Sequence, residues 1–280
     1  MKTIIRQATN NAMTVVYNDF NEADWIMQNC ESVFSRLAAK WKNGEVNWHW
    51  LDGYNRERYD RNTFHWACTT VENRCQGENR LPRDLICNWE RWLKKDEQAV
   101  FRQFAIKAGS SLLDVLEQKI QTEIDGRYRL EIFKRSYVLC RIIEYPKNTE
   151  HGLLALEHYD PSLLTLLYGA TETGLEIKDQ LNGWKTMPHE RISYIINGRW
   201  LEYINKSMKA TLHRVQSNKS EKRRYSLQCF LLVDADRIRT DGISDTEMLL
   251  ALEKIGSHYK HTFLEYSPNE RWRKSNNSRC

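Results

Sequence analysis

Apolar residues in the first part of the chain recur at the spacing of an amphipathic helix. From Trp25 to Trp41 they fall three or four positions apart, and the polar stretch 21–24 before them resembles a helix N-terminal cap. A second run with the same spacing extends from about residue 98 to 124. The pattern therefore predicts two helices, with residues 43–88 between them as loop with short elements.

The pattern changes after Asp125-Gly126, where short runs of β-type residues replace the helical spacing. Eight runs are predicted as strands: 129–145, 153–158, 163–168, 175–178, 184–187, 192–196, 210–215 and 225–233. Asn182-Gly183 and Asn197-Gly198 are typical of tight hairpins, because both residue types tolerate positive φ. Eight short strands at this spacing indicate a β sandwich or barrel. A capping-box pattern at Ser244 predicts a last helix that runs to about Phe263.

The order of these elements favours one domain. A length of 280 residues fits about two domains at ~150 residues each, but β folds of this size are often single. We therefore predict one domain over 1–280, of mixed α and β structure (α+β). Its parts are a mainly helical segment at 1–125, a β core at 126–240, and a C-terminal helix with its tail at 241–280.

Composition and charge narrow the class of protein. Lys and Arg number 42 against 37 Asp and Glu, so the net charge is only +5, which does not indicate nucleic acid as a partner. No apolar run is long enough for a membrane span, and no signal peptide is expected. Seven scattered cysteines without a Cys-x-x-Cys pair are typical of reduced thiols, which predicts a cytoplasmic protein.

Candidate chemistry lies in the segment Glu157-His158-Tyr159-Asp160. Residues two apart on a strand share a face, so His158 and Asp160 can present an imidazole and a carboxylate on the same side. His213 lies in another strand-like run. Two histidines and one carboxylate with open coordination positions are the facial triad of non-haem Fe(II) oxygenases. A surface aspartate beside a packed histidine is the competing interpretation of the first pair alone.

A second pair of polar residues follows in the last predicted strand. Arg224 and Ser226 are two residues apart and share a strand face. A guanidinium beside a hydroxyl is suited to holding a carboxylate, since the guanidinium offers parallel donors. The alternative is that Arg224 is a solvated charge in the basic run 222–224.

The segment from about residue 137 to 234 resembles the Fe(II)/2-oxoglutarate-dependent oxygenases of the isopenicillin N synthase-like, plant-type branch. The resemblance is carried by the order and spacing of many short motifs. In chain order these are Arg141-Ile142-Ile143-Glu144-Tyr145-Pro146, Glu157-His158-Tyr159-Asp160, Leu163-Leu164-Thr165-Leu166-Leu167, Gly174-Leu175-Glu176-Ile177, Gly183-Trp184, Asn197-Gly198, Leu212-His213-Arg214-Val215 and Arg224-Tyr225-Ser226.

The resemblance implies a single catalytic domain with a double-stranded β-helix (jelly-roll, cupin-like) core, flanked by N-terminal and C-terminal helices. It implies that His158, Asp160 and His213 bind iron, and that Arg224 and Ser226 hold the distal carboxylate of 2-oxoglutarate. Tyr145 would contact this co-substrate. Phe230 matches a substrate-facing aromatic residue of some members, although an ordinary core position is an equal alternative for it.

The activity implied is that of an oxidoreductase. A dioxygenase of this family would use Fe(II), 2-oxoglutarate and O2 to hydroxylate, desaturate or cyclise a small molecule, with release of succinate and CO2. Asp160 disfavours a halogenating enzyme, because relatives of that kind have a small residue at this position. The sequence does not identify the substrate or the oligomeric state.

Three departures from the family pattern mark the chain as divergent. Ile143 stands where asparagine is common, and Asn197-Gly198-Arg199 stands where Gly-Asp is common. The usual N-terminal Pro-x-Ile-Asp-Leu motif is absent, with Thr14-Val15-Val16-Tyr17 as a candidate for the corresponding strand. The family's substrate contacts therefore cannot be transferred to this chain.

Other functions remain as alternatives. An oxidase of the isopenicillin N synthase type would use iron without 2-oxoglutarate, and Arg224 with Ser226 would then hold the substrate's own carboxylate. A non-catalytic protein on the same fold would bind a ligand, for example nucleic acid, through the basic runs 219–224 and 271–279. A zinc site made of His65, Cys68, Cys75 and Cys87 is disfavoured, because their spacing matches no common ligand pattern.

Overall fold

The computed structural model describes more than half of the N-terminal part of the chain and most of the β core. The described residues are 4–7, 13–17, 20–43, 53–56, 61–69, 89–120, 136–147, 152–179, 183–188, 192–217 and 221–233. The helix expected at 244–263 and the tail after it lie outside these residues.

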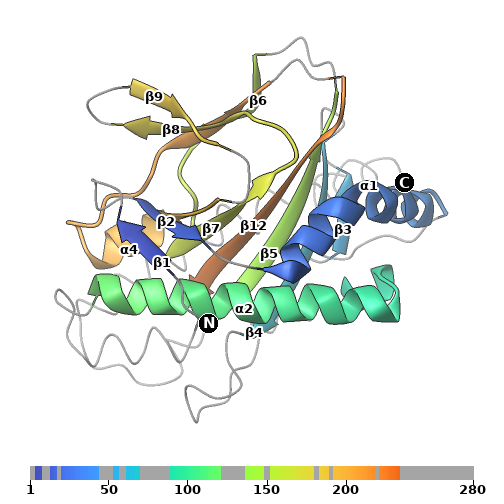
Figure 1. Cartoon of the computed structure of the whole chain (residues 1–280), viewed down its shortest axis with the longest axis horizontal. Helices are drawn as coiled ribbons and strands as arrows, with labels where there is room; N and C mark the ends of the chain where they lie inside the picture. The colour runs from blue at the N-terminus through green and yellow to red at the C-terminus, as the bar shows by residue number, and fades with distance from the viewer. Residues whose placement is uncertain are drawn as a thin grey trace, which may run out of the picture.

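Two antiparallel sheets form the body of the molecule (Figure 1). The larger sheet has the strand order β1-β2-β10-β7-β12-β5-β4-β3, and the smaller one has the order β6-β11-β8-β9. In the larger sheet the strands are β1 Ile4–Gln7, β2 Met13–Tyr17, β3 Gly53–Arg56, β4 Asn62–Thr69, β5 Ser136–Tyr145, β7 Leu164–Ala170, β10 Ser193–Asn197 and β12 Arg224–Val233. In the smaller sheet they are β6 Leu153–His158, β8 Leu175–Asp179, β9 Gly183–Thr186 and β11 His213–Gln216.

The two sheets face each other across a small apolar core. Leu167, Tyr194 and Ile196 of the larger sheet pack in one cluster with Ile177 of the smaller sheet and with Met187, which directly follows β9. Each of the eight predicted strands has a counterpart in this arrangement. The prediction succeeds here because these strands are short apolar runs separated by clear turn residues.

The larger sheet extends beyond the predicted core at 126–240. Four of its eight strands, β1 to β4, come from the segment expected to be mainly helical. β4 pairs with β5 from Asn62↔Glu144 to Thr69↔Tyr137, so it continues the sheet in full register. The prediction of loop with short elements over 43–88 did not identify β4 as a full strand of this sheet, because its polar and aromatic residues hide the period of a strand.

Helices α1 (Asn21–Lys42) and α2 (Lys95–Ile120) cover the outer face of the larger sheet (Figure 1). Ile26 and Phe34 of α1 and Phe104 and Leu112 of α2 are fully buried in the cluster that also contains Leu227 of β12. This cluster is much larger than the core between the sheets. The apolar residues whose spacing predicted both helices thus form the faces that the helices bury against the sheet.

The start of α1 differs from the expectation that residues 21–24 cap it. Phe20 is the N-cap residue and is buried, and its side chain makes no capping hydrogen bond. Glu22 and Asp24 lie in the first helical turn, where negative charge interacts favourably with the helix dipole. Tyr168 of β7 donates a hydrogen bond to Asp24 Oδ1 (3.0 Å), and Lys107 of α2 forms an ion pair with Glu22.

Residues 43–92 are rich in tryptophan and tyrosine, and the described aromatic residues of this segment belong to the core. Tyr54, Trp66, Trp89 and Trp92 are buried, the last two in the short 3-10 helix η3 (Trp89–Trp92). Trp66 packs against Phe101 in a tilted arrangement with ring centroids 4.8 Å apart, and it donates its indole N–H to the Phe101 carbonyl oxygen. These side chains join β3 and β4 to α2, as expected for core residues rather than for a substrate pocket.

Gly198 does not form the hairpin expected at Asn197-Gly198. Its φ of −94° is ordinary, and the chain continues into helix α4 (Arg199–Ile204). Glycine is required because a Cβ atom here would lie 2.0 Å from the carbonyl oxygen of Ser162. The close approach lets Arg199 N–H donate to the Asp160 carbonyl oxygen (2.8 Å) and Trp200 N–H donate to the Ser162 carbonyl oxygen (3.0 Å). Gly198 therefore holds the loop of Asp160 against α4.

Gly198→Ala is expected to lower the free energy of unfolding by about 1–3 kcal/mol, because overpacking displaces the backbone of the 160–162 loop. Urea denaturation measures the effect. Gly152→Ala is the matched control, since a Cβ there meets no atom within 4 Å and the residue does not need positive φ. Equal stability of the two variants would contradict the proposed packing constraint.

Candidate functional site

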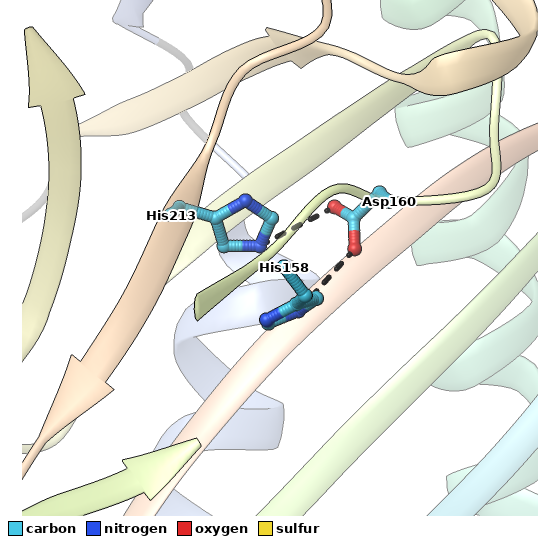
Figure 2. Close-up of side chains that lie close together, drawn as sticks. All are labelled: His158, Asp160 and His213. Carbon is cyan, nitrogen blue, oxygen red and sulfur yellow. Dashed lines mark ion pairs between the residues drawn. The ribbon is translucent and has the colours of Figure 1, made fainter. Parts of the chain in front are cut away.

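The three residues singled out in the sequence meet at one end of the smaller sheet. His158 ends β6 and His213 begins β11, and the two are direct cross-strand partners. Asp160 follows β6 by two residues, and Figure 2 shows its carboxylate directed toward both imidazole rings. Asp160 Oδ1 lies 3.7 Å from His158 Nε2, and Oδ2 lies 3.7 Å from His213 Nε2.

Each histidine is oriented by its own strand. The Nδ1 atom of His158 lies 2.7 Å from the Leu156 carbonyl oxygen, and that of His213 lies 3.1 Å from the Thr211 carbonyl oxygen. A carbonyl oxygen only accepts, so Nδ1 carries the proton in both rings. With Nδ1 engaged in this way, Nε2 of each ring faces the shared space and can offer its lone pair, as in metal-binding histidines.

The cluster fits a metal ion better than it fits a hydrogen-bonded triad. The 3.7 Å separations are too long for hydrogen bonds, and Oδ2 of the buried Asp160 has no hydrogen-bond partner. One ligand atom from each residue lies within 4.8 Å of the others, and this is the metal-type cluster found in the described part of the chain. A divalent cation would satisfy the orphaned carboxylate oxygen and both Nε2 atoms.

The electrostatics of the cluster favour the protonation states that a metal needs. Burial raises the pKa of Asp160, but the neighbouring histidines, His213 first, outweigh it and hold that pKa below its usual value. Partial burial and the proximity of His213 lower the pKa of His158. The carboxylate is therefore ionised and the imidazole of His158 is neutral near pH 7. His158 is also the open side of the cluster, with 41% of its side chain exposed.

The predicted carboxylate-binding pair lies at the start of β12. Arg224 is buried and pairs across the sheet with Tyr145 of β5, whose ring centroid lies 5.2 Å from the guanidinium carbon. Its Nε donates to the carbonyl oxygens of Glu172 and Thr173, both at 3.2 Å. Nη1 of Arg224 and Oγ of Ser226 are buried and have no hydrogen-bond partner among the described residues.

Those unsatisfied atoms define what this second site can bind. Burial lowers the pKa of Arg224, and the hydroxyl of Tyr145 opposes that shift, so the guanidinium remains charged. A buried cation with an unused donor beside an unused hydroxyl is costly unless an anion binds there. The two sites are therefore a candidate metal centre and a candidate carboxylate site. They share one barrel, because β12 and β6 belong to facing sheets.

Phe230 lies on the same strand face as Arg224 and Ser226 but is buried. The guanidinium of Arg141 covers its ring at 4.9 Å. The same guanidinium donates a hydrogen bond to Gln228 Oε1, an interaction that the motif at 141–146 does not predict. A charged residue in the middle of the apolar run 136–145 was the signal that could have identified this position.

The described residues do not assemble the alternative zinc site. His65 and Cys68 lie three residues apart on β4, so they point to opposite faces of the sheet. Cys75 and Cys87 lie outside the described residues. The four described cysteines, Cys30, Cys68, Cys140 and Cys229, are free and buried. None of the described helices is both long and apolar enough to cross a membrane.

Comparison with known proteins gives one family match. Residues 135–232 match the model of the 2OG-Fe(II) oxygenase superfamily. This segment runs from β5 to β12 and contains both candidate sites. No curated protein sequence matches the chain.

Several solved structures share the fold at low sequence identity. AtDAO1, the dioxygenase for auxin oxidation 1 from Arabidopsis thaliana in a 2-oxoglutarate complex, superposes with a TM-score of 0.64 at 18% identity over 80% of this chain and 84% of that one. A putative oxygenase from Shewanella oneidensis gives 0.58 at 21% identity, over 88% and 90%. A putative 2OG-Fe(II) oxygenase family protein from Caulobacter crescentus gives 0.57 at 19% identity, over 80% and 78%. The predicted double-stranded β-helix core is confirmed, and α1 and α2 are its N-terminal flanking helices; the predicted C-terminal helix lies outside the described residues.

Proposed function

We propose that this protein, whose residues 135–232 form a domain of the 2OG-Fe(II) oxygenase superfamily, oxidises a small molecule at a non-haem iron centre. The superfamily makes it an oxidoreductase that uses Fe(II), 2-oxoglutarate and O2. The reaction proposed is substrate–H + 2-oxoglutarate + O2 → substrate–OH + succinate + CO2. Desaturation or ring closure is the variant in which the substrate loses two hydrogens and the oxygen leaves as water.

The observation that carries this proposal is the convergence of His158, Asp160 and His213 on one point. Two Nε2 lone pairs and one ionised carboxylate oxygen face each other without direct hydrogen bonds. When bound there, Fe(II) would activate dioxygen and couple decarboxylation of 2-oxoglutarate to oxidation of the substrate.

The chain itself supplies the positioning. The carbonyl oxygens of Leu156 and Thr211 accept the Nδ1 protons and so fix both imidazole rings. The hydrogen bond from Arg199 N–H to the Asp160 carbonyl oxygen fixes the loop that carries the carboxylate. The three ligand side chains would thus be held by β6, β11 and α4 before a metal binds, which lowers the ordering cost of binding.

Arg224, Ser226 and Tyr145 would hold the distal carboxylate of 2-oxoglutarate. The carboxylate would accept hydrogen bonds from Arg224 Nη1 and Ser226 Oγ, both of which are buried and unsatisfied. The buried ring of Tyr145 lies against the Arg224 guanidinium and would keep water out of this end of the barrel. The alternative oxidase would place a carboxylate of its own substrate at the same position.

Anaerobic titration followed by turnover tests the proposal. Fe(II) and then 2-oxoglutarate are added to the protein, and the visible charge-transfer absorption of the chelated 2-oxo acid is recorded. We expect the band to form, and succinate to appear on admission of O2 in an iron-dependent reaction. Iron binding without the band or succinate would favour the oxidase. Absence of iron binding would favour a non-catalytic protein.

A further inference from the structure

The middle of the larger sheet contains one accessible pair of residues among buried neighbours. In β5 only Arg141 is not buried, and in β12 only Gln228 is not buried. The two are direct cross-strand partners. Helices α1 and α2 seal the outer face of these strands, where Ile142 and Leu227 are fully buried. The accessible surface of Arg141 and Gln228 therefore faces the inside of the barrel.

This pair lies between the candidate co-substrate site and the barrel core. On the inner face of β12, Gln228 follows Ser226 and precedes Phe230. Its partner Arg141 lies four residues before Tyr145, which pairs with Arg224 at the co-substrate end of the same two strands. A molecule that reached Arg141 and Gln228 would therefore lie next to the candidate co-substrate site.

The side chains of the pair are fixed in position. Arg141 donates to Gln228 Oε1 through Nη2 at 2.6 Å and through Nε at 3.2 Å, and the guanidinium stacks on Phe230. Arginine only donates, so the Gln228 atom facing it is the amide oxygen, and the amide NH2 group points away from it. Among the described residues no acceptor takes a hydrogen bond from that NH2 group.

We propose that Arg141 and the amide NH2 group of Gln228 bind a carboxylate of the primary substrate, so that the substrate class is small carboxylic acids. The inference rests on the proposed function, because it assigns the oxidised molecule rather than the co-substrate. The charge of Arg141 attracts the carboxylate, and Gln228 adds a directed donor. Phe230 is a positioning residue, because its ring packs against the Arg141 guanidinium and holds it in place.

Matched acids and amides test the proposal by binding alone. The anaerobic Fe(II)- and 2-oxoglutarate-loaded protein is titrated by calorimetry with phenylacetate, 3-phenylpropanoate and octanoate, and with the primary amide of each. At least one acid should bind, at least about 10-fold more tightly than its amide. Arg141→Gln should weaken acid binding by about 30-fold or more and remove the preference over the amide. Gln228→Met should weaken it by a smaller factor.

Two controls separate the possible failures. Arg102→Gln removes an arginine on α2 that pairs with Glu90, far from the barrel interior, and should retain wild-type acid binding. The charge-transfer band should form equally in wild-type protein and in Arg141→Gln. If the band is missing from the wild type, the proposed function fails. If the band forms but no acid binds, or Arg141→Gln keeps the acid preference, the carboxylate inference is overturned while the proposed function stands.

Discussion

His213→Ala is expected to abolish succinate formation and to weaken Fe(II) binding by more than about 100-fold. The side chain is one of three converging ligands, and the loss of a partner that only orients a ligand already costs about 10–100-fold in metal affinity. Removal of the imidazole leaves Nε2 of His158 and the Asp160 carboxylate, which is too few for tight binding. Anaerobic calorimetry with Fe(II) and a succinate assay measure the two effects.

The fold should survive this change. His213 is buried, but its ring makes a hydrogen bond only to the carbonyl oxygen two residues away, so the substitution strands no distant partner. Val215→Ala is the matched control, because Val215 is also buried on the same face of β11 and loses apolar atoms without losing a ligand. Val215→Ala should bind iron normally. Full turnover by a folded His213→Ala protein would refute the metal assignment.

The metal cluster could be predicted from sequence because its geometry is mostly local. His158 ends β6 and Asp160 follows it by only two residues, so the short separation keeps both side chains near one point even though Asp160 lies just beyond the strand. The pairing of His213 with His158 is not local. It depends on the register of β11 against β6, which the sequence indicated only through the resemblance to a family.

Other features could not be predicted because they depend on distant contacts. Gly198 looked like a hairpin residue, but its role comes from the carbonyl oxygen of Ser162 more than thirty residues earlier. β4 lacks a clear strand pattern, and it is a strand because β5 offers it a complete register. Arg141 resembled one motif residue among many until its burial could be compared with that of its neighbours on β5.

Arg224→Ala is expected to raise the KM for 2-oxoglutarate by about 30-fold or more and to leave Fe(II) binding unchanged. Removal of one partner from a buried, hydrogen-bonded charge pair costs about 2–5 kcal/mol, and every 1.4 kcal/mol is about tenfold in affinity. In the free protein the change also removes a buried donor, Nη1, that has no partner. It also removes the Nε donor to the carbonyl oxygens of Glu172 and Thr173, so urea denaturation accompanies the KM measurement to separate lost affinity from lost stability.

Arg224→Lys and Ser226→Ala divide that loss between charge and geometry. Lysine keeps the positive charge but lacks the planar set of donors that reaches the carbonyl oxygens of Glu172 and Thr173 and the bound carboxylate together. Arg224→Lys should therefore recover only part of the 2-oxoglutarate affinity that Arg224→Ala loses. Ser226→Ala removes one donor to an anion, worth about 1.5–3 kcal/mol, and should raise KM by about tenfold or more. Steady-state succinate assays at varied 2-oxoglutarate measure both. An unchanged KM for 2-oxoglutarate in Arg224→Ala would favour the oxidase, in which the same guanidinium holds the substrate's own carboxylate.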